Sequence, residues 1–250
     1  MRGVLLAGGT ATRLKPLTNV TNKHLLPVYN KPMIYYPLET LLKAGIKDIL
    51  IVTGGEHVED FFRLLGSGEE WKARFHYAIQ EGSGGTGAAL SLAENFVHDE
   101  EFMVILGDNV VSENIKQFVE AFKKEKNEYN AKILVAKVKD PQNYGVVTFK
   151  GKKIIEIIEK PKKPKSHFVN TGLWMFLPDV FKQLKTLKKS PRGEYEITDV
   201  LSLYAREGTL SYSILKSHWT DAGTLESLYN ATVLMKKRED RQKKRRFSKR

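Results

Sequence analysis

The sequence predicts an α/β fold with a doubly wound, mostly parallel, Rossmann-like sheet and a smaller mixed β/α region packed on it. Short apolar runs that end in glycine alternate with segments of helical periodicity through the first half of the chain. Buried strands joined by helices are typical of parallel sheets, because the helices then cover both faces. After about Lys139 the sequence changes to closely spaced β-branched runs, which indicate hairpins.

The first half of the chain supplies the elements of the predicted parallel sheet. Apolar or alternating runs predict strands at 2–7, 48–53, 74–80, 102–106 and 131–138. Apolar residues at helical spacing predict helices at 33–44, 58–65, 88–96 and 113–126. Strands and helices therefore alternate, as a doubly wound sheet requires.

The second half predicts a smaller region of mixed strands and helices. Runs at 144–150 and 153–158 flank Gly151-Lys152, which indicates a hairpin. Further strands are expected at 168–176 and 209–215, and helices at 178–187 and 197–206. No linker or internal repeat is visible. We therefore expect one domain over residues 1–235, made of parts at about 1–138 and 139–223 and a closing helix at 224–235.

The net charge of +12 is concentrated at one end of the chain. Residues 236–250 hold ten Lys and Arg against two Asp and Glu, and we interpret them as a poorly ordered, solvated helix end. A basic protein can bind nucleic acid, but the rest of the sequence has no recognition-helix or aromatic RNA-binding motif. Nucleic acid is therefore not an expected partner.

Composition excludes several classes of protein. The chain has 250 residues, of which 41% are hydrophobic, so it can bury a sizeable core. It has no cysteine, which excludes disulfides, thiolate metal sites and a cysteine nucleophile. The N-terminus lacks the apolar region of a signal peptide, and no stretch approaches the roughly 20 apolar residues of a membrane span. We expect a cytoplasmic protein with no membrane partner.

The loop after the first predicted strand has the properties of a phosphate site. Gly8 and Gly9 let the backbone approach a ligand, and their N–H groups can bind an anion. Arg13 adds positive charge on the same loop, and Lys23 follows closely enough in sequence to reach the same phosphate chain. The loop matches neither the GxxxxGK[ST] nor the GxGxxG pattern. Glycines that only form a turn, and a lysine that only lies on the surface, are the alternatives.

Two carboxylates occupy positions that suit a metal ion. Asp108 follows a predicted central strand, and ligands of open α/β sheets lie beyond the carboxyl ends of the strands. Asp221 precedes the predicted closing helix. Mg²⁺ binds one or two carboxylates together with phosphate oxygens and water. The alternatives are a turn aspartate at 108 and a helix cap at 221.

Three weaker signals suggest contacts with a base and a sugar. Gln80 ends a predicted strand before a glycine-rich loop, and its amide can both donate to and accept from a base edge. Glu159 and Lys160 offer charges for sugar hydroxyls and phosphate, or form a turn before proline. Trp219 is either a core residue or a platform for a sugar ring.

Eight motifs occur in order along the chain: LAGGTATRLKPLT, NKHLLPVYNKPMIYYPLETLLKAGIKDILIVTG, VILGDN, DPQNYGVV, EKPKKPKS, NTGLW, RGEYEITDV and HWTDAGT. Together they resemble the sugar-1-phosphate nucleotidyltransferases, and within that family the short bacterial thymidylyltransferases. The resemblance covers Arg2 to about Tyr229. It implies Mg²⁺-dependent transfer of a nucleotidyl group from dTTP to glucose 1-phosphate by in-line attack, which gives dTDP-glucose and pyrophosphate. It also leaves open whether the chain forms a homo-oligomer.

The resemblance implies a role for each candidate residue. The part at about 1–138 would bind the nucleotide, and the part at about 139–223 would bind the sugar. The catalytic cations would be Arg13 and Lys23, and the Mg²⁺ ligands would be Asp108 and Asp221. The nucleotide would contact Leu6, Ala7, Gly8, Gly9, Gln80 and Gly85. The sugar would contact Tyr144, Gly145, Glu159, Lys160, Asn170, Gly172 and Trp219.

Three positions depart from the pattern of the family. Ala11 stands where glycine is usual in the phosphate loop, and His24 stands where the thymidylyltransferases usually carry glutamine. The glycine-rich loop after Gln80, GGTGAAL, also differs from the GLAQA-like sequence that is usual in the thymidylyltransferases. Two alternatives follow: the same chemistry with UTP or another sugar 1-phosphate, and a non-catalytic regulatory protein that binds an NDP-sugar.

Overall fold

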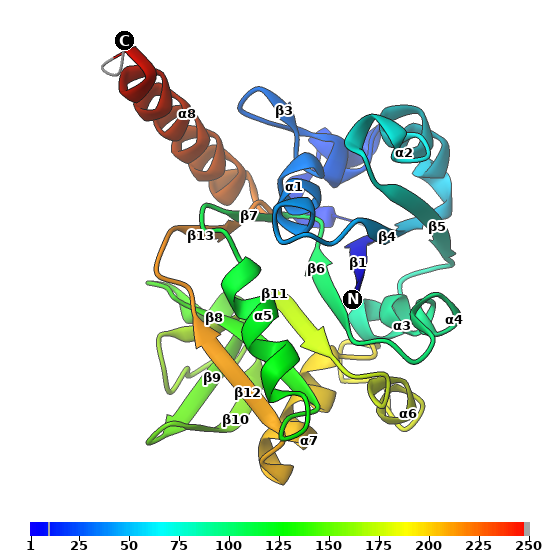
Figure 1. Ribbon diagram of the computed structural model, residues 1–250, viewed down its shortest axis with the longest axis vertical. Coiled ribbons are helices and arrows are strands. Elements are labelled where there is room, and N and C mark those ends of the chain that lie inside the picture. The colour runs from blue at the N-terminus through cyan, green and yellow to red at the C-terminus, as the bar shows by residue number, and fades with distance from the viewer. Residues whose placement is uncertain (10, 248–250) are drawn as a thin grey trace.

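The computed structural model describes residues 1–9 and 11–247, with side chains to residue 244. Its main feature is a mixed sheet of nine strands in the described part of the chain (Figure 1). Four parallel strands form one half, in the order β6, β1, β4 and β5. Their bounds are Arg2–Ala7 for β1, Asp48–Gly54 for β4, Arg74–Gln80 for β5 and Phe102–Leu106 for β6. The predicted α/β fold with a largely parallel central sheet is confirmed.

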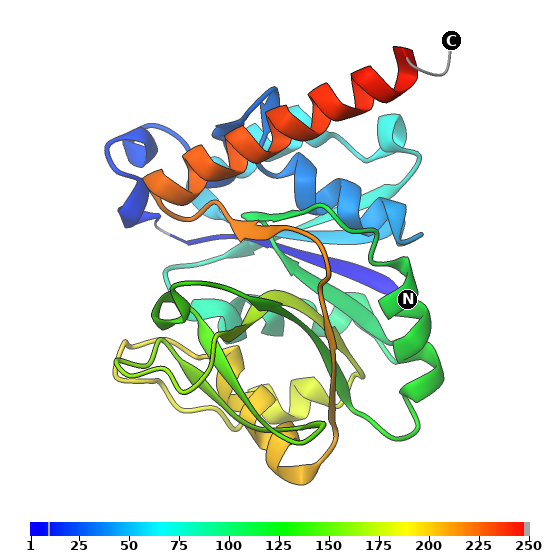
Figure 2. The ribbon, with the colours of Figure 1, turned by 90° about the vertical axis from the view of Figure 1, so that its left-hand side faces the viewer.

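The other half of the sheet reverses direction at β11 (Phe168–Phe176), which the sequence did not indicate. β11 runs antiparallel to β6, to β8 (Ala131–Lys137) and to β9 (Gly145–Lys150). β9 forms a hairpin with β10 (Lys153–Glu159), and β12 (Leu210–Ile214) runs parallel to β8. This half curls, as Figure 2 shows, so that the rings of Phe149 on β9 and Tyr212 on β12 lie 4.8 Å apart.

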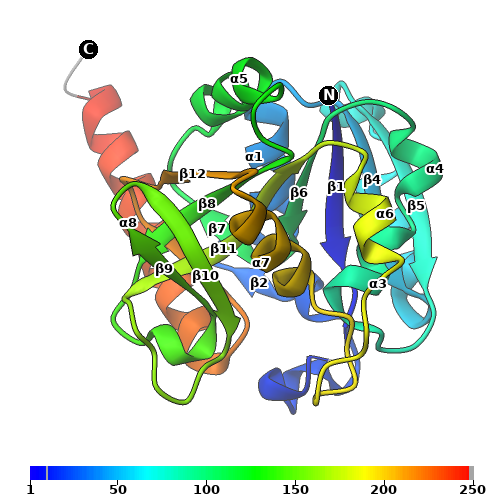
Figure 3. The same cartoon turned by 90° about the horizontal axis from the view of Figure 1, so that it is seen from below.

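Helices cover both faces of the sheet (Figure 3). One face packs against α1 (Tyr35–Lys43), α2 (Val58–Leu65) and α5 (Lys116–Glu125). The other packs against α3 (Gly85–Ser91), α4 (Glu94–Val97), α6 (Val180–Leu184) and α7 (Ile197–Glu207). β1 contributes to both cores in alternation, with Val4 and Leu6 on one face and Leu5 and Ala7 on the other. Because both faces of β1 are buried, its sequence is a continuous apolar run.

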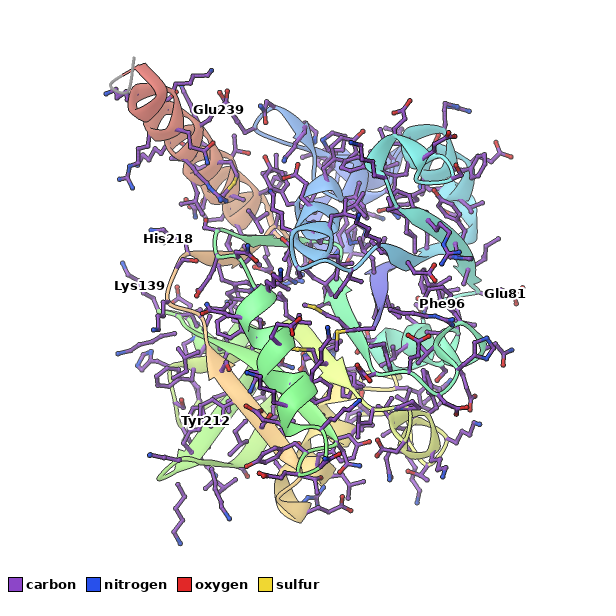
Figure 4. All side chains as sticks on the ribbon, in the orientation of Figure 1. Glu81, Phe96, Lys139, Tyr212, His218 and Glu239 are labelled. Carbon is purple, nitrogen blue, oxygen red and sulfur yellow. The ribbon has the colours of Figure 1, made fainter. Side chains whose placement is uncertain are left out.

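The last helix, α8 (Leu225–Phe247), begins against the body of the protein and then extends away from it (Figures 1 and 2). Ala231 and Met235 pack into a third apolar cluster. The sequence placed the end of this helix at residue 235, but the structure continues it to Phe247. Lys, Arg, Glu and Gln are good helix formers, and Glu239 (Figure 4) accepts a hydrogen bond from Asn30 at 3.0 Å and pairs with Lys243 at 2.7 Å. Residues 248–250 of the basic tail lie outside the described residues.

Other differences from the expected elements are local. The segment expected to be helical at 88–96 forms two helices, α3 and α4. Four short strands were not predicted: β2 (Pro27–Val28), β3 (Lys31–Pro32), β7 (Asn109–Val111) and β13 (Trp219–Asp221). Among the described residues, no helix is both long and apolar enough to span a membrane.

Candidate active site

A cavity of about 370 Å³ lies at the carboxyl ends of β1 and β6 and extends toward the antiparallel half of the sheet. All the candidate residues of the sequence line it, with one exception. The exception is Ala7, whose side chain is buried in the core beside α1. The structure therefore brings together residues that are spread from Leu6 to Asp221 in the sequence.

The two candidate metal ligands meet through an unpredicted pair of short strands. β7 and β13 pair antiparallel, with Asp221 opposite Asn109, and the Ala222 N–H donates to the Asp108 carbonyl at 2.9 Å. A Cβ placed on Gly223 would lie 2.9 Å from Asp221 Oδ2 and 3.6 Å from Asp108 Oδ2. The two carboxylates therefore face one point beside Gly223.

The environment of Asp108 suits a cation. Lys23 Nζ lies 2.6 Å from Asp108 Oδ2. Asp108 Oδ1 is buried and has no hydrogen-bond partner among the residues that the structure describes. Burial alone would raise the pKa of Asp108, but nearby charges and hydrogen bonds, of which the Lys23 ammonium is the largest, together outweigh burial and lower the pKa. A buried carboxylate oxygen without a donor is costly unless a cation reaches it.

The pKa of Asp221 shifts in the opposite direction to that of Asp108. Burial, and then the neighbouring charge of Asp108, raise the pKa of Asp221 above its usual value. Two carboxylates that share a site repel each other, so a cation between them lowers the free energy of both ions. The described residues contain no group of three or more His, Cys, Asp or Glu side chains arranged for a metal. Two carboxylates are nevertheless enough for Mg²⁺ when a phosphate and water complete its ligands.

The phosphate loop presents Arg13 to the same point. Arg13 lies in a 3-10 turn, Thr12–Leu14, and its side chain is exposed. Its Nη2 would be 3.3 Å from a Cβ on Gly223, and the structure gives the guanidinium no ion pair with the residues it describes. Ala11 adopts a left-handed conformation with φ 48° and ψ 37°. The Thr18 hydroxyl donates to the Ala11 carbonyl at 3.0 Å and so holds this turn.

Gln80 and two glycines form the side of the cavity that the sequence assigned to the base. Gln80 Nε2 donates to the Gly85 carbonyl at 3.2 Å. A Cβ on Gly8 would lie only 2.7 Å from Gln80 Oε1, and a Cβ on Gly85 would lie 3.0 Å from the Tyr195 carbonyl. Any side chain at either glycine would therefore enter occupied space.

His24 also lines this cavity, although it is only 1% exposed. Its Nδ1 is 2.8 Å from Asn22 Oδ1. Burial, assisted by the charge of Lys23, lowers the pKa of His24 to about 3. The imidazole is therefore neutral, and a Cβ on Gly107 would contact it at 2.7 Å.

The candidate sugar residues form the opposite wall. Glu159 Oε2 accepts a hydrogen bond from Thr198 at 2.8 Å, and Glu159 Oε1 lies 3.5 Å from Lys160 Nζ. Asn170 Oδ1 accepts from the indole of Trp174 at 2.6 Å, which leaves its amide nitrogen available to a ligand. Gly172 has φ 81° where the pairing of β11 with β8 is irregular. Such a bulge redirects neighbouring side chains toward a site.

The sequence missed several residues that line this wall. Arg192 lies 3.7 Å from Glu159 and 3.2 Å from Glu196, so it joins the charged cluster. Asn109 binds the indole N–H of Trp219, and its own amide nitrogen is buried without a partner among the described residues. The segment RGEYEITDV contains Arg192, Glu196 and Thr198, and its mixed charges before a helix were the available signal.

Comparison with known proteins identifies the family. The model of the family described as "Nucleotidyl transferase" matches residues 2–238. A glucose-1-phosphate thymidylyltransferase of Neisseria meningitidis is 40% identical over 235 residues, which is 92% of this chain and 81% of that protein. The corresponding protein of Neisseria gonorrhoeae is 42% identical over the same shares of both chains.

Solved structures share the fold. A Bacillus anthracis protein assigned as a glucose-1-phosphate thymidylyltransferase, crystallised with sucrose, is 47% identical and superimposes with a TM-score of 0.89 over 94% of each chain. A UDP-glucose pyrophosphorylase complexed with UDP-glucose is 26% identical, with a TM-score of 0.82 over 95% of this chain and 98% of that one.

Proposed function

This chain belongs to the nucleotidyl transferase family, and we propose that it transfers a thymidylyl group from dTTP to glucose 1-phosphate. The products are dTDP-glucose and pyrophosphate. The observation that carries the proposal is the convergence of Arg13, Lys23, Asp108 and Asp221 at one end of one cavity. Two cations and two carboxylates suit a reaction that must bring two phosphate esters together.

The cavity divides into a nucleotide side and a sugar side. Gly8, Gln80 and Gly85 receive the base and the start of the triphosphate. Glu159 and Asn170, on the opposite wall, receive the sugar hydroxyls. The cations lie between these walls, where the α-phosphate of the nucleotide meets the phosphate of the sugar.

Asp108 and Asp221 would hold Mg²⁺. The buried, unpartnered Oδ1 of Asp108 supports this assignment, because a divalent cation would supply the charge that the oxygen lacks. When bound there, Mg²⁺ offsets negative charge on the α-phosphate and on the sugar phosphate.

The chemistry needs no protein nucleophile. A phosphate oxygen of the sugar 1-phosphate forms a bond to the α-phosphorus of dTTP, and the bond from that phosphorus to the β-phosphate bridging oxygen breaks in line with it. The electron pair leaves with pyrophosphate. Arg13 stabilises the charge that builds on the leaving group, and Lys23 reduces repulsion between the two reacting phosphates. Catalysis then comes from alignment and from preorganised charge.

Pyrophosphate release tests this function. The protein is incubated with Mg²⁺, glucose 1-phosphate and one of dTTP, UTP, CTP, GTP or ATP. Release that requires both the sugar phosphate and dTTP supports the proposal. Absence of release with every nucleotide, repeated with other sugar 1-phosphates, contradicts it and favours the alternative of a non-catalytic NDP-sugar-binding protein.

UTP is the second candidate nucleotide, and one observation favours it. The solved UDP-glucose pyrophosphorylase shares the fold over nearly the whole chain. A preference for UTP in the same assay would keep the mechanism and change the base.

A further inference from the structure

The side-chain rotation of Asp221 is not fixed by its strand. Pairing of β13 with β7 places the backbone of Asp221 next to Asn109, but the carboxylate can still rotate about its own side-chain bonds. A candidate metal ligand must present the same oxygen each time, because a site that is loose by about 1 Å loses much of its function. Some other group must therefore orient this carboxylate.

Tyr144 provides that group. Its hydroxyl donates to Asp221 Oδ1 at 2.9 Å. The other oxygen, Oδ2, lies beside Gly223, where a Cβ would be 2.9 Å from it, 3.3 Å from Arg13 Nη2 and 3.6 Å from Asp108 Oδ2. The two oxygens of Asp221 thus have different surroundings: Oδ1 binds the Tyr144 hydroxyl, and Oδ2 lies at the point that Asp108 and Arg13 also approach.

The Tyr144 ring is itself held in place. It packs against Trp219 edge to face, with ring centroids 5.4 Å apart and an angle of 65°. The Trp219 indole N–H binds Asn109 Oδ1, so the aromatic pair is anchored to the residue after Asp108. The Tyr144 backbone N–H donates to Pro141, and its carbonyl accepts from Lys160.

We propose that Tyr144 is a positioning residue for the metal site, which holds Asp221 so that Oδ2 points at the cation, in addition to the sugar contact that the sequence assigned to it. The inference rests on the proposed function, because that function places Mg²⁺ between Asp108 and Asp221. Tyr144 precedes Gly145 on the sugar wall, so the same residue links the sugar wall to the metal carboxylate.

The test is the Mn²⁺ affinity of the protein in excess thymidine monophosphate, which supplies the phosphate ligand from the nucleotide side, measured from the electron paramagnetic resonance signal of free Mn²⁺. Tyr144→Phe removes only the hydroxyl and should weaken Mn²⁺ binding by about 10-fold or more, as loss of such a supporting hydrogen bond commonly does. Tyr77→Phe is the matched control, since the Tyr77 hydroxyl binds the Gly66 carbonyl at 2.6 Å outside the cavity. That variant should bind Mn²⁺ like the wild type.

Three outcomes are distinct. Weaker Mn²⁺ binding by Tyr144→Phe alone, with an unchanged melting temperature, supports the inference. Equal Mn²⁺ binding by the wild type, Tyr144→Phe and Tyr77→Phe overturns the inference. The proposed function still stands in that case if the wild type releases pyrophosphate. Failure of the wild type to bind Mn²⁺ overturns both the two-carboxylate site and the role of Tyr144, whatever the transfer assay shows.

Discussion

The backbone of Gly8 and the side chain of Gln80 are in direct contact, so that a Cβ on Gly8 would lie 2.7 Å from Gln80 Oε1. Gly8 follows β1 and Gln80 ends β5, and the two meet because both strands finish at the same edge of the sheet. Gly8 and Gln80 are far apart in the sequence, and their contact in the folded chain defines the wall that would receive the base.

Gly8→Ala should displace Gln80 and weaken nucleotide binding. We expect the KM for dTTP to rise by about 10-fold, which corresponds to roughly 1.4 kcal/mol, with little change in the KM for glucose 1-phosphate. Steady-state kinetics with each substrate varied in turn measure this. Gly54→Ala is the control, because a Cβ there meets nothing within 4 Å. Equal effects on the two KM values would contradict the assignment of this wall to the nucleotide.

Arg13→Ala should reduce turnover without unfolding the protein. Loss of one preorganised donor costs about 10²–10³ in rate, and the exposed Arg13 side chain contributes no ion pair with the described residues. We expect a fall in kcat of at least about 100-fold and an unchanged melting temperature. Lys15→Ala, an exposed cation on the same loop outside the cavity, should keep its turnover. An Arg13→Ala variant with near-full turnover would remove this residue from the mechanism.

Asp108→Asn should raise the Mg²⁺ requirement and lower turnover. The amide keeps the size of the side chain but removes the charge that faces Lys23 and, by our proposal, the metal. A Mg²⁺ titration of pyrophosphate release should shift to higher concentrations. Asp60→Asn, which changes a half-buried carboxylate on α2 outside the cavity, serves as the control for loss of one negative charge. A Mg²⁺ dependence that matches the wild type would mean that the metal binds elsewhere.

Ala11→Gly should stabilise the protein. Ala11 has φ 48°, a conformation that costs an L-residue roughly 1–2 kcal/mol and costs glycine nothing. The larger unfolded-state entropy of glycine offsets part of this, so we expect a gain of about 0.5–1 kcal/mol in the free energy of unfolding. Urea unfolding measures it. Ala44→Gly, at φ −78°, is the control and should give no gain in the free energy of unfolding. A loss of stability in Ala11→Gly would show that the conformation of Ala11 is not strained.

Much of the fold was predictable because the core imposes local patterns. β1, β5, β6, β11 and α2 have the bounds that the sequence predicted, since each carries an uninterrupted apolar run or a clear period. The reversal at β11 was not predictable, because a buried antiparallel strand between two neighbours looks the same in sequence as a parallel one.

The site was predictable where a residue stands next to a predicted strand. Asp108, Gly8 and Gln80 follow or end strands, and the cavity includes all three. The way Asp221 reaches Asp108 was not predictable, because β7 and β13 are three residues long and pair across more than 100 positions of sequence. Arg192 was missed for a similar reason, since its partners Glu159 and Glu196 come together only in the folded chain.

Isotope exchange distinguishes direct transfer between two bound phosphates from transfer through a nucleotidyl-protein intermediate. The wild-type protein is incubated with Mg²⁺ and radiolabelled pyrophosphate, either with dTDP-glucose or with dTTP alone. Direct transfer predicts labelled dTTP and free glucose 1-phosphate from dTDP-glucose, and no exchange of label into dTTP in the absence of the sugar. Exchange into dTTP alone would reveal a nucleotidyl-protein intermediate, and no label from dTDP-glucose would contradict the proposed reaction.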